Sequence, residues 1–197
     1  MVKVPAIVLA AGASTRCSGT PKLQRIYRGK PLLLWALENL ALGELISSLI
    51  VVTGFQSGEV AILCEGIPDC RVVQNQRWAE GLSTSLRVGL EALPKDCPGA
   101  LVALGDTPFF QESTLRAVVP NESELQDFRY PVYNGQAGHP KYFPRWSFAE
   151  MANLSGDVGA KLVMKAHPDQ CHELVVDDPG ILRDFDLATD FEVDDSN

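Results

Sequence analysis

The sequence predicts an α/β fold, in which a mostly parallel sheet carries helices on both of its faces. Continuous apolar runs of strand length occur at residues 4–10, 48–53 and 100–104, as expected for strands that are buried on both faces. Helical patterns separate these runs. Strands that alternate with helices in this way form right-handed βαβ units, and their ligands bind beyond the carboxyl ends of the strands.

The other elements follow from apolar periodicity and from helix stop signals. We expect helices at residues 32–42, 57–64, 82–93, 112–119 and 157–166, and short strands at 71–73, 129–133, 141–143 and 173–176. Gly43 ends the first helix, and Asn134-Gly135 forms a turn between two of the short strands. No linker divides the chain, so a single domain over residues 1–197 is predicted.

Composition and charge narrow the class of protein. The chain of 197 residues has a net charge of −8, which argues against a general nucleic-acid-binding surface. No apolar run approaches the roughly 20 residues that a membrane helix needs. The five cysteines are odd in number and form no CxxC pair, which indicates reduced thiols. We therefore expect a cytoplasmic protein that binds neither membranes nor nucleic acids.

The basic residues are concentrated at the start of the chain. Residues 1–30 contain Lys3, Arg16, Lys22, Arg25, Arg28 and Lys30 and no acidic residue, although the chain as a whole is acidic. A local basic region of this kind suits a small anionic ligand. A solvated basic surface is the alternative interpretation.

The loop after the first strand, from Leu9 to Lys22, is rich in small residues. Gly12 and Gly19 allow backbone N–H groups to approach phosphate oxygens, while Arg16 and Lys22 supply positive charge. The spacing matches neither a Walker A loop nor a dinucleotide-binding fingerprint. On physical grounds alone, a flexible loop with incidental charge explains these residues equally well.

This loop resembles the signature of the MobA-like nucleotidyltransferases, with Leu9-Ala10-Ala11-Gly12, then Ser14, Arg16 and Pro21-Lys22. It is most similar to that of the molybdenum cofactor cytidylyltransferases. Further stretches resemble family motifs in the same order: Thr53-Gly54, Gly81–Leu86, Leu104–Pro108, Gly138-His139-Pro140, Ser155–Ala160 and Asp184–Phe191. Two departures stand out. Arg16 and Lys22 are one residue further apart than in the family, and Leu187-Ala188 replaces Thr-Pro.

The resemblance implies a three-layer α/β/α Rossmann-like nucleotidyltransferase fold. The NTP would bind to about residues 1–110 and the acceptor to about residues 111–193, followed by a polar tail at 194–197. The implied nucleotide-binding residues are Leu9, Ala10, Ala11, Gly12, Lys22, Ser83 and Ser85. The implied catalytic residues are Arg16, Lys22 and Asp106, and His139 is expected on the acceptor side. The two serines are equally compatible with helix capping, and His139 with a purely structural role.

A magnesium site is also expected. Transfer of a nucleotidyl group joins and separates negatively charged groups, and magnesium prefers carboxylate oxygens, waters and phosphates. The resemblance implies Asp106 as the first ligand and Asp186 as its partner, with Asp184 and Asp190 nearby. Both ligands have an alternative role, because a turn aspartate can cap the helix that follows it.

The implied reaction is the transfer of a cytidylyl group from CTP to molybdopterin that carries molybdenum. Ala11 stands where guanylyltransferases of the group have glycine, and its methyl group narrows the pocket in favour of a pyrimidine. The resemblance also implies transient contact with a molybdoenzyme or its chaperone. The alternatives are GTP as donor, a sugar-phosphate or alditol-phosphate acceptor, and a non-catalytic accessory protein for molybdoenzyme maturation.

Overall fold

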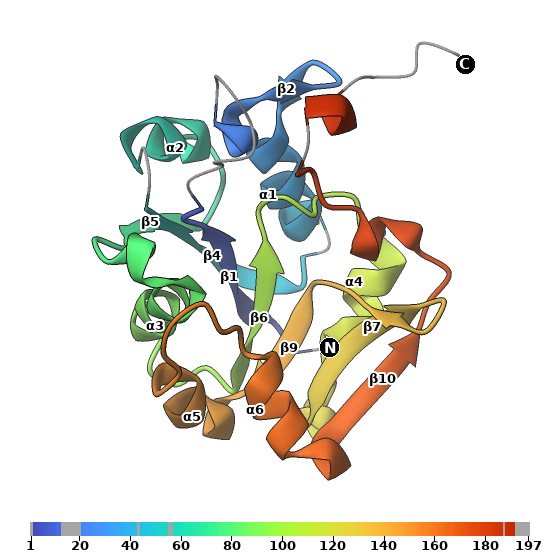
Figure 1. Cartoon of the computed structure of the whole chain (residues 1–197). Helices are drawn as coiled ribbons and strands as arrows, with labels where there is room; N and C mark the ends of the chain where they lie inside the picture. The colour runs from blue at the N-terminus through green and yellow to red at the C-terminus, as the bar shows by residue number, and fades with distance from the viewer. Residues whose placement is uncertain (1, 13–20, 43, 55–56, 187, 192–197) are drawn as a thin grey trace.

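The structure is a computed structural model that describes residues 2–12, 21–42, 44–54, 57–186 and 188–191 (Figure 1). The strands of its main sheet are β1 (Val4–Ala10), β4 (Ile46–Thr53), β5 (Cys70–Gln74), β6 (Gly99–Leu104), β7 (Phe128–Tyr133), β8 (Gln136–Ala137), β9 (Lys141–Pro144) and β10 (Cys171–Val175). The helices are α1 (Leu32–Leu42), α2 (Ser57–Cys64), α3 (Leu82–Glu91), α4 (Glu112–Val118), α5 (Phe148–Ala152) and α6 (Lys161–Ala166). A separate hairpin joins β2 (Ile26–Tyr27) to β3 (Lys30–Pro31).

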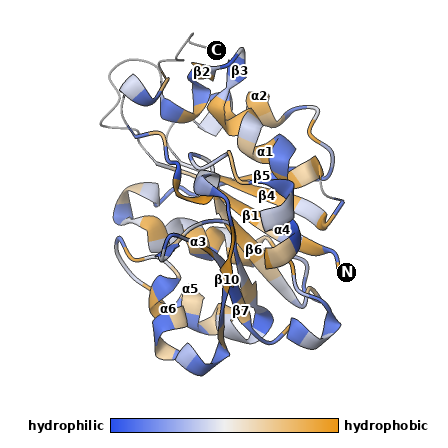
Figure 2. Ribbon diagram, turned by 90° about the vertical axis from the view of Figure 1, so that its right-hand side faces the viewer, coloured by the Kyte–Doolittle hydropathy of each residue, from blue (hydrophilic) through white to orange (hydrophobic). Residues whose placement is uncertain are grey.

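The sheet lies between two layers of helices. Along β1, Val8 packs into a core with α1, α2 and α4, whereas its neighbour Ile7 packs into the core on the opposite face. Successive strand residues point to opposite faces, so an apolar strand such as β1 contributes to both cores. In Figure 2 the apolar strands β1, β4 and β6 lie between the helices. The three-layer α/β/α fold predicted from the sequence is confirmed.

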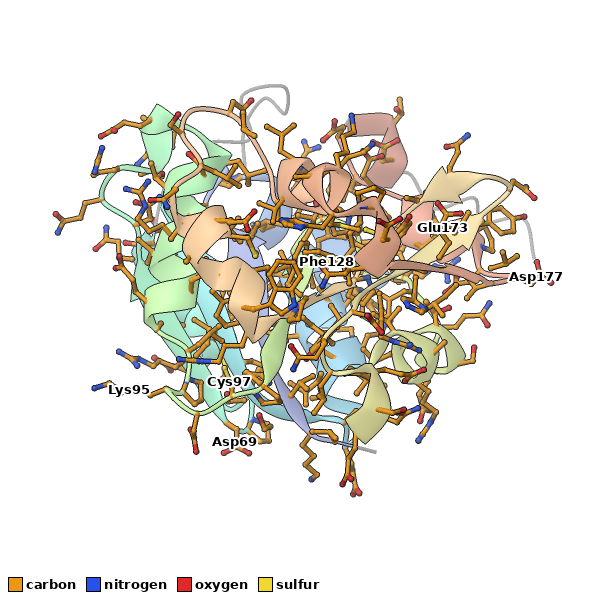
Figure 3. All side chains as sticks on the ribbon, turned by 90° about the horizontal axis from the view of Figure 1, so that it is seen from below. Asp69, Lys95, Cys97, Phe128, Glu173 and Asp177 are labelled. Carbon is orange, nitrogen blue, oxygen red and sulfur yellow. The ribbon has the colours of Figure 1, made fainter. Side chains whose placement is uncertain are left out.

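The order of the strands, β10–β7–β9–β6–β1–β4–β5, creates the place for a ligand. The strand β1 pairs in parallel with β4 on one side and with β6 on the other. The chain therefore moves outward from β1 to β5 and then returns to the opposite side of β1. In α/β sheets, ligands bind beyond the carboxyl ends of strands at such a switch point. Figure 3 looks onto the opposite end of the sheet, where Asp69 and Lys95 precede β5 and β6.

Most predicted elements are present, with three differences. The helix predicted at 157–166 begins only at Lys161, because Gly156 has a φ of 75° and its carbonyl accepts hydrogen bonds from Ser83 at the start of α3. The turn at Asn134-Gly135 joins β7 to β8 rather than to β9, which pairs antiparallel with β6. The helix α5 and the hairpin β2–β3 were not predicted from the sequence.

The chain after β10 returns across the carboxyl end of the sheet. Asp178, which is buried, fixes this segment to the start of α4: its carboxylate accepts hydrogen bonds from Gln111 N at 2.7 Å, Thr114 Oγ1 at 2.6 Å and Gly180 N at 3.0 Å. Further along, the fully buried Phe185 packs among aromatic rings. No helix in the described part of the chain is long and apolar enough to cross a membrane.

Candidate functional site

A large cleft opens where β1 and β6 end, and we call it the main cleft. Its volume is about 710 Å³, and its walls are Leu9, Ala11, Gly12, Trp78, Ala79, Glu80, Gly81, Leu82, Ser85, Leu104, Asp106 and Asp157. The predicted residues Leu9, Ala11, Gly12, Ser85 and Asp106 thus line one cleft. Ala10 is buried at the end of β1 beside them. Arg16 lies outside the described residues.

Lys22 joins the two aspartates that were predicted as metal ligands. Its Nζ lies 2.6 Å from Asp106 Oδ2 and 2.8 Å from Asp186 Oδ1. The Lys22 side chain is only 14% exposed, so this contact is partly shielded from water. The structure therefore brings together three side chains that are far apart in the sequence, with one ammonium group between two carboxylates.

The positions of Asp106 and Lys22 follow from the end of β6. Leu9 and Leu104 are register partners, and Gly105 N donates to Leu9 O at 3.1 Å, which holds the turn that carries Asp106 against the end of β1. Lys22 begins a short 3₁₀ helix, Lys22–Gln24, whose Leu23 is buried in the core next to Gly105. The burial of Leu23 thus fixes the backbone from which Lys22 reaches Asp106.

Asp186 is held by an aromatic cluster. Its neighbour Phe185 packs with ring centroids 4.9 Å from Tyr27 and 5.6 Å from Phe109. The Arg183 guanidinium lies over the same rings and donates to Tyr27 Oη at 2.9 Å. Burial of a phenylalanine stabilises a fold by roughly 1.5–3 kcal/mol, so this cluster is a strong anchor for the segment. It places Asp186 beside a lysine that is 164 residues away in the chain.

The two carboxylates favour the charged form of Lys22. Burial by itself lowers the pKa of Lys22, but the charge of Asp106 and the hydrogen bonds to Asp106 and Asp186 outweigh it, and the pKa is raised above its ordinary value. Burial raises the pKa of the nearby Asp184, and the charges of Asp186 and Asp106 raise it further. Three carboxylates therefore lie within electrostatic reach of one another at the end of the sheet.

These carboxylates fit a hard divalent cation. Magnesium needs only one or two protein carboxylates when phosphates and waters complete its coordination, and Asp106 and Asp186 already converge on a single cationic atom. In the described part of the chain, no group of three or more histidine, cysteine, aspartate or glutamate side chains forms a metal cage. The arrangement therefore suits a metal that arrives with its phosphate ligands.

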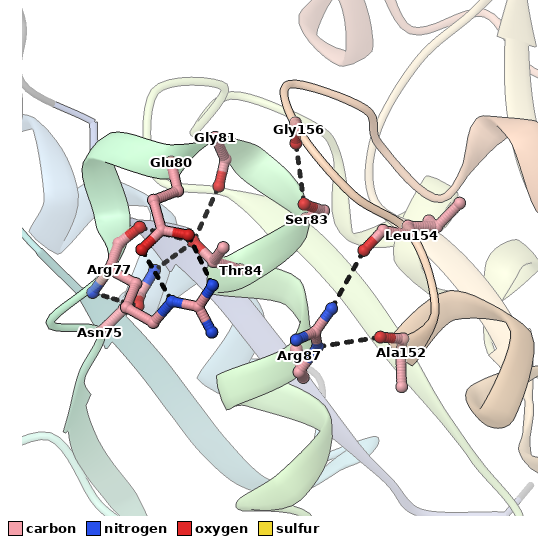
Figure 4. Close-up of polar contacts among 10 residues, drawn as sticks. All are labelled: Asn75, Arg77, Glu80, Gly81, Ser83, Thr84, Arg87, Ala152, Leu154 and Gly156. Atoms are coloured by element: carbon pink, nitrogen blue, oxygen red, sulfur yellow. Dashed lines mark hydrogen bonds and ion pairs between the residues drawn. The ribbon is translucent and has the colours of Figure 1, made fainter.

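The two serines at the start of α3 have different environments, and Figure 4 shows the contact of Ser83 with Gly156. Ser83 is buried, and its N and Oγ both donate to Gly156 O, at 3.3 and 2.8 Å. Ser85 faces the main cleft and accepts a hydrogen bond from Asn75 Nδ2 at 2.9 Å. Neither caps the helix, because the N-cap residue is Gly81. A role of either serine in nucleotide binding stays a prediction.

A comparison with protein families assigns the chain. The model described as the MobA-like NTP transferase domain matches residues 6–171. The chain belongs to this family. This family membership agrees with the motifs along the sequence, from Leu9 to Phe191.

Two relatives of this MobA-like protein differ in how much of their length the chain covers. The bifunctional protein GlmU of Thermus thermophilus is 39% identical over 116 residues, which cover 57% of this chain and 24% of that protein. The chain thus spans about a quarter of such relatives. Nicotine blue oxidoreductase of Paenarthrobacter nicotinovorans is 28% identical over 172 residues, which cover 84% of this chain and 83% of that protein. Since its name denotes another reaction, likeness over most of the chain does not by itself fix the chemistry.

Among solved structures, Rv0371c from Mycobacterium tuberculosis superposes on this MobA-like chain with a TM-score of 0.80, 30% identity and 96% coverage of both chains. A second structure of Rv0371c is a complex with manganese; it has 29% identity, 89% coverage of both chains and a TM-score of 0.71. A divalent metal therefore binds to a protein that shares this fold over nearly its whole length.

His139 lies away from the carboxylates, in a smaller cavity. This inner cavity, of about 170 Å³, adjoins the main cleft through Leu9, Leu82 and Leu104, which line both. Burial, and then the nearby charge of Lys141, lower the pKa of His139 to about 3, so the imidazole is neutral at neutral pH. The structure thus separates His139 from Lys22 and Asp106, on a cavity next to the main cleft.

Several residues of this site were not predicted from the sequence. Asn75 is buried and organises α3 by donating to Thr84 Oγ1 and Ser85 Oγ, at 2.8 and 2.9 Å. Asp157 lines the main cleft, and Lys141 lines the inner cavity. A signal existed for Lys141, since it is a charged residue at the first position of a short strand that is otherwise apolar.

Proposed function

We propose that this protein transfers the cytidylyl group of CTP to molybdopterin that carries molybdenum, and releases pyrophosphate. The observation that carries the proposal is the Lys22 ammonium shared by Asp106 and Asp186, beside the loop that begins at Ala11. In this cluster Lys22 supplies an ammonium group for phosphate oxygens, and the two carboxylates would hold the divalent metal that accompanies a triphosphate. The motifs Gly138-His139-Pro140 and Ser155–Ala160 favour the molybdopterin acceptor.

The reaction needs no covalent intermediate with the protein. An oxygen of the acceptor phosphate attacks the α-phosphorus of the nucleotide, and the bond from that phosphorus to the bridging oxygen of pyrophosphate breaks. The protein therefore contributes positioning and charge stabilisation. Lys22 binds the triphosphate oxygens, and the backbone at Gly12 allows close approach. Arg16 is proposed to bind the same phosphates through its guanidinium.

Asp106 and Asp186 would hold a magnesium ion. When bound, such an ion neutralises charge on the phosphates and on the departing pyrophosphate. The manganese complex of Rv0371c supports a divalent metal in this role. Lys22 offsets part of the charge of the two aspartates, and its contacts hold both carboxylates in place.

The preference for CTP rests on Ala11. This residue is buried in the wall of the main cleft, and its backbone carbonyl packs closely against Gly54. A methyl group in this wall leaves less room for a purine than glycine would. One methyl group provides about 1–3 kcal/mol of discrimination, so GTP is expected as a poorer donor rather than an excluded one.

The test is the release of pyrophosphate from purified protein that is incubated with magnesium, each NTP in turn, and molybdenum cofactor. We expect release with CTP, a large loss in Asp106→Asn, and no loss in the matched control Asp96→Asn, which alters an exposed aspartate before β6. Release with GTP but not CTP would overturn the base assignment. An absence of release with every NTP would overturn the molybdenum-cofactor reaction.

Two further arms separate the alternatives. A phosphorylated sugar or alditol in place of the molybdenum cofactor tests the other acceptor class on the same fold. If no acceptor yields pyrophosphate while the cofactor still binds tightly, the protein is a maturation accessory protein. The ionic contact of Lys22 with both aspartates argues against that outcome, because a carrier would not need it.

A further inference from the structure

Three neighbouring cavities extend from the main cleft into the C-terminal part of the molecule. The inner cavity adjoins the main cleft, and it shares Lys141 and Lys161 with an outer cavity of about 480 Å³. Tyr130 and Glu173 also line the outer cavity, at the β10 side of the sheet. Lys165 lines the outer cavity alone, so Lys141 and Lys161 are the lysines that both cavities share.

Lys141 is an unusual residue for its position. It is 6% exposed and lies in β9, where it is the register partner of Val102. Phe143, two residues further on, packs against α5 and α6, so the Lys141 side chain points toward the same face. Its Nζ lies 5.6 Å from the centroid of the Tyr130 ring, a contact worth about 0.5–2 kcal/mol.

Neither lysine has an acidic partner in the described part of the chain. No carboxylate there lies within 4.0 Å of the Nζ of Lys141 or Lys161. Glu173, which lines the outer cavity, instead accepts a hydrogen bond from Tyr130 Oη at 2.8 Å. A buried charge without a partner costs several kcal/mol, so the buried ammonium of Lys141 destabilises the folded protein.

Burial and the proximity of these basic groups lower the pKa values of Lys141 and His139. Burial, and then the charge of Lys161, lower the pKa of Lys141 to about 8. The pKa of His139 is lowered as described above, in part by Lys141. Positive charge is therefore concentrated in this cavity, and an anion from outside would relieve the repulsion.

We propose that Lys141 and Lys161 bind an anionic group of the acceptor, of the phosphate class, and thereby hold the acceptor next to the main cleft. This inference rests on the proposed transfer to a phosphorylated acceptor. Phosphate fits because it accepts several hydrogen bonds and can bridge two ammonium groups. His139, being neutral, adds a hydrogen-bonding group rather than charge. The two lysines are thus specificity-determining residues for the acceptor, whereas Lys22 binds the triphosphate of the nucleotide.

The binding test uses inorganic phosphate as the probe, in a calorimetric titration at constant ionic strength. The proteins are the full chain, Lys141→Met, Lys161→Met and the control Lys95→Met, an exposed lysine at the opposite end of the sheet (Figure 3). We expect phosphate affinity to fall by about tenfold or more in each of the first two variants and not in the control. Lys161 is exposed, so its variant tests the proposal even if the Lys141 variant fails to fold. No binding to the wild type, or equal binding to all four proteins, would overturn the proposal.

Titration with succinate in place of phosphate separates a phosphate site from a general carboxylate site. Stronger binding of succinate would overturn the assignment to phosphate. Kinetics with molybdenum cofactor then separate this inference from the proposed function. We expect a higher KM for the cofactor in Lys161→Met, with the affinity for CTP unchanged. If the wild type turns over and this KM does not move, the inference fails alone. If no NTP is used while phosphate still binds at the two lysines, the proposed function fails alone.

Discussion

Lys22 and Lys141 show how differently the two parts of this molecule treat a shielded positive charge. In the N-terminal half, Lys22 lies between two carboxylates, and its pKa is raised. In the C-terminal half, Lys141 is more deeply buried, has no carboxylate partner within the described residues, and its pKa is lowered to about 8. Lys141 lines the inner cavity, and Lys22 contacts Asp106 in the wall of the main cleft.

The contrast indicates how each site is prepared for its ligand. The charge of Lys22 is already balanced, so it keeps Asp106 and Asp186 aligned before any ligand binds. The charge of Lys141 is not balanced, so the fold bears a cost that an anionic ligand can offset. A charge that is paired within the protein orients other groups, whereas an unpaired buried charge points to a partner from outside.

The largest effect is expected at Lys22. Substitution Lys22→Met removes the cation between Asp106 and Asp186, which leaves two carboxylates that repel each other and a triphosphate without its ammonium. We expect pyrophosphate release to fall by about 100-fold or more, as for the loss of one well-oriented electrostatic group. Steady-state kinetics measure this, with Lys95→Met as the control. Normal turnover in Lys22→Met would remove the basis for treating Lys22 as the paired, functional lysine.

The next effect concerns the anchor that brings the C-terminal segment to the site. Asp178→Ala leaves the donors of Gln111, Thr114 and Gly180 without their acceptor. We expect a loss of about 3 kcal/mol in the free energy of unfolding, measured by urea denaturation. The control is Asp177→Ala, since that neighbouring side chain is exposed. Equal stability of the two variants would show that Asp178 does not anchor the segment.

A pH-dependent effect distinguishes Lys141 from an ordinary lysine. Between pH 8 and 10.5 the unfolded chain binds a proton at this residue that the folded chain releases, so its contribution to stability rises with pH. The stability of the wild type minus that of Lys141→Met should therefore increase over this range, by at most about 3 kcal/mol. Urea denaturation at pH 8 and pH 10 measures it, and the subtraction removes the shared tyrosine and cysteine titrations. A difference that does not change with pH would mean that folding does not lower the pKa of Lys141.

The smallest effect is expected at the base pocket. Ala11→Gly removes one methyl group from the wall of the main cleft and should raise kcat/KM for GTP relative to CTP by about tenfold. Competition between the two nucleotides measures the ratio. An unchanged ratio would show that Ala11 does not select CTP over GTP. It would not affect the comparison of Lys22 with Lys141.

Much of the fold could be predicted because its strands are continuous apolar runs. The predicted boundaries of residues 4–10 and 32–42 match β1 and α1, since apolar pattern and stop signals coincide there. The prediction failed at 157–160, where contacts with α3 rather than local periodicity decide the backbone. The turn at Asn134-Gly135 was recognised, but its partner strand β8 is only two residues long and leaves no periodic signal.

The candidate site was predictable only in part. Asp106 follows an apolar strand, and a carboxylate at that place is a local signal. The contact of Lys22 with Asp186 is not local, because it depends on the packing of Phe185 against Tyr27 and Phe109. The environment of Lys141 could not be foreseen either, since its burial depends on how β9 packs beside α6. Local patterns indicate which residues carry chemistry, and tertiary packing decides which of them meet.

The most direct test of the central claim is the affinity of the protein for CTP in the presence of manganese, followed by the EPR signal of the metal. If Asp106 and Asp186 form the metal–triphosphate site together with Lys22, Asp106→Asn and Asp186→Asn should each weaken the complex by about tenfold or more. The control Asp169→Asn, before β10, should bind as the wild type does. Wild-type affinity in Asp106→Asn would contradict the account.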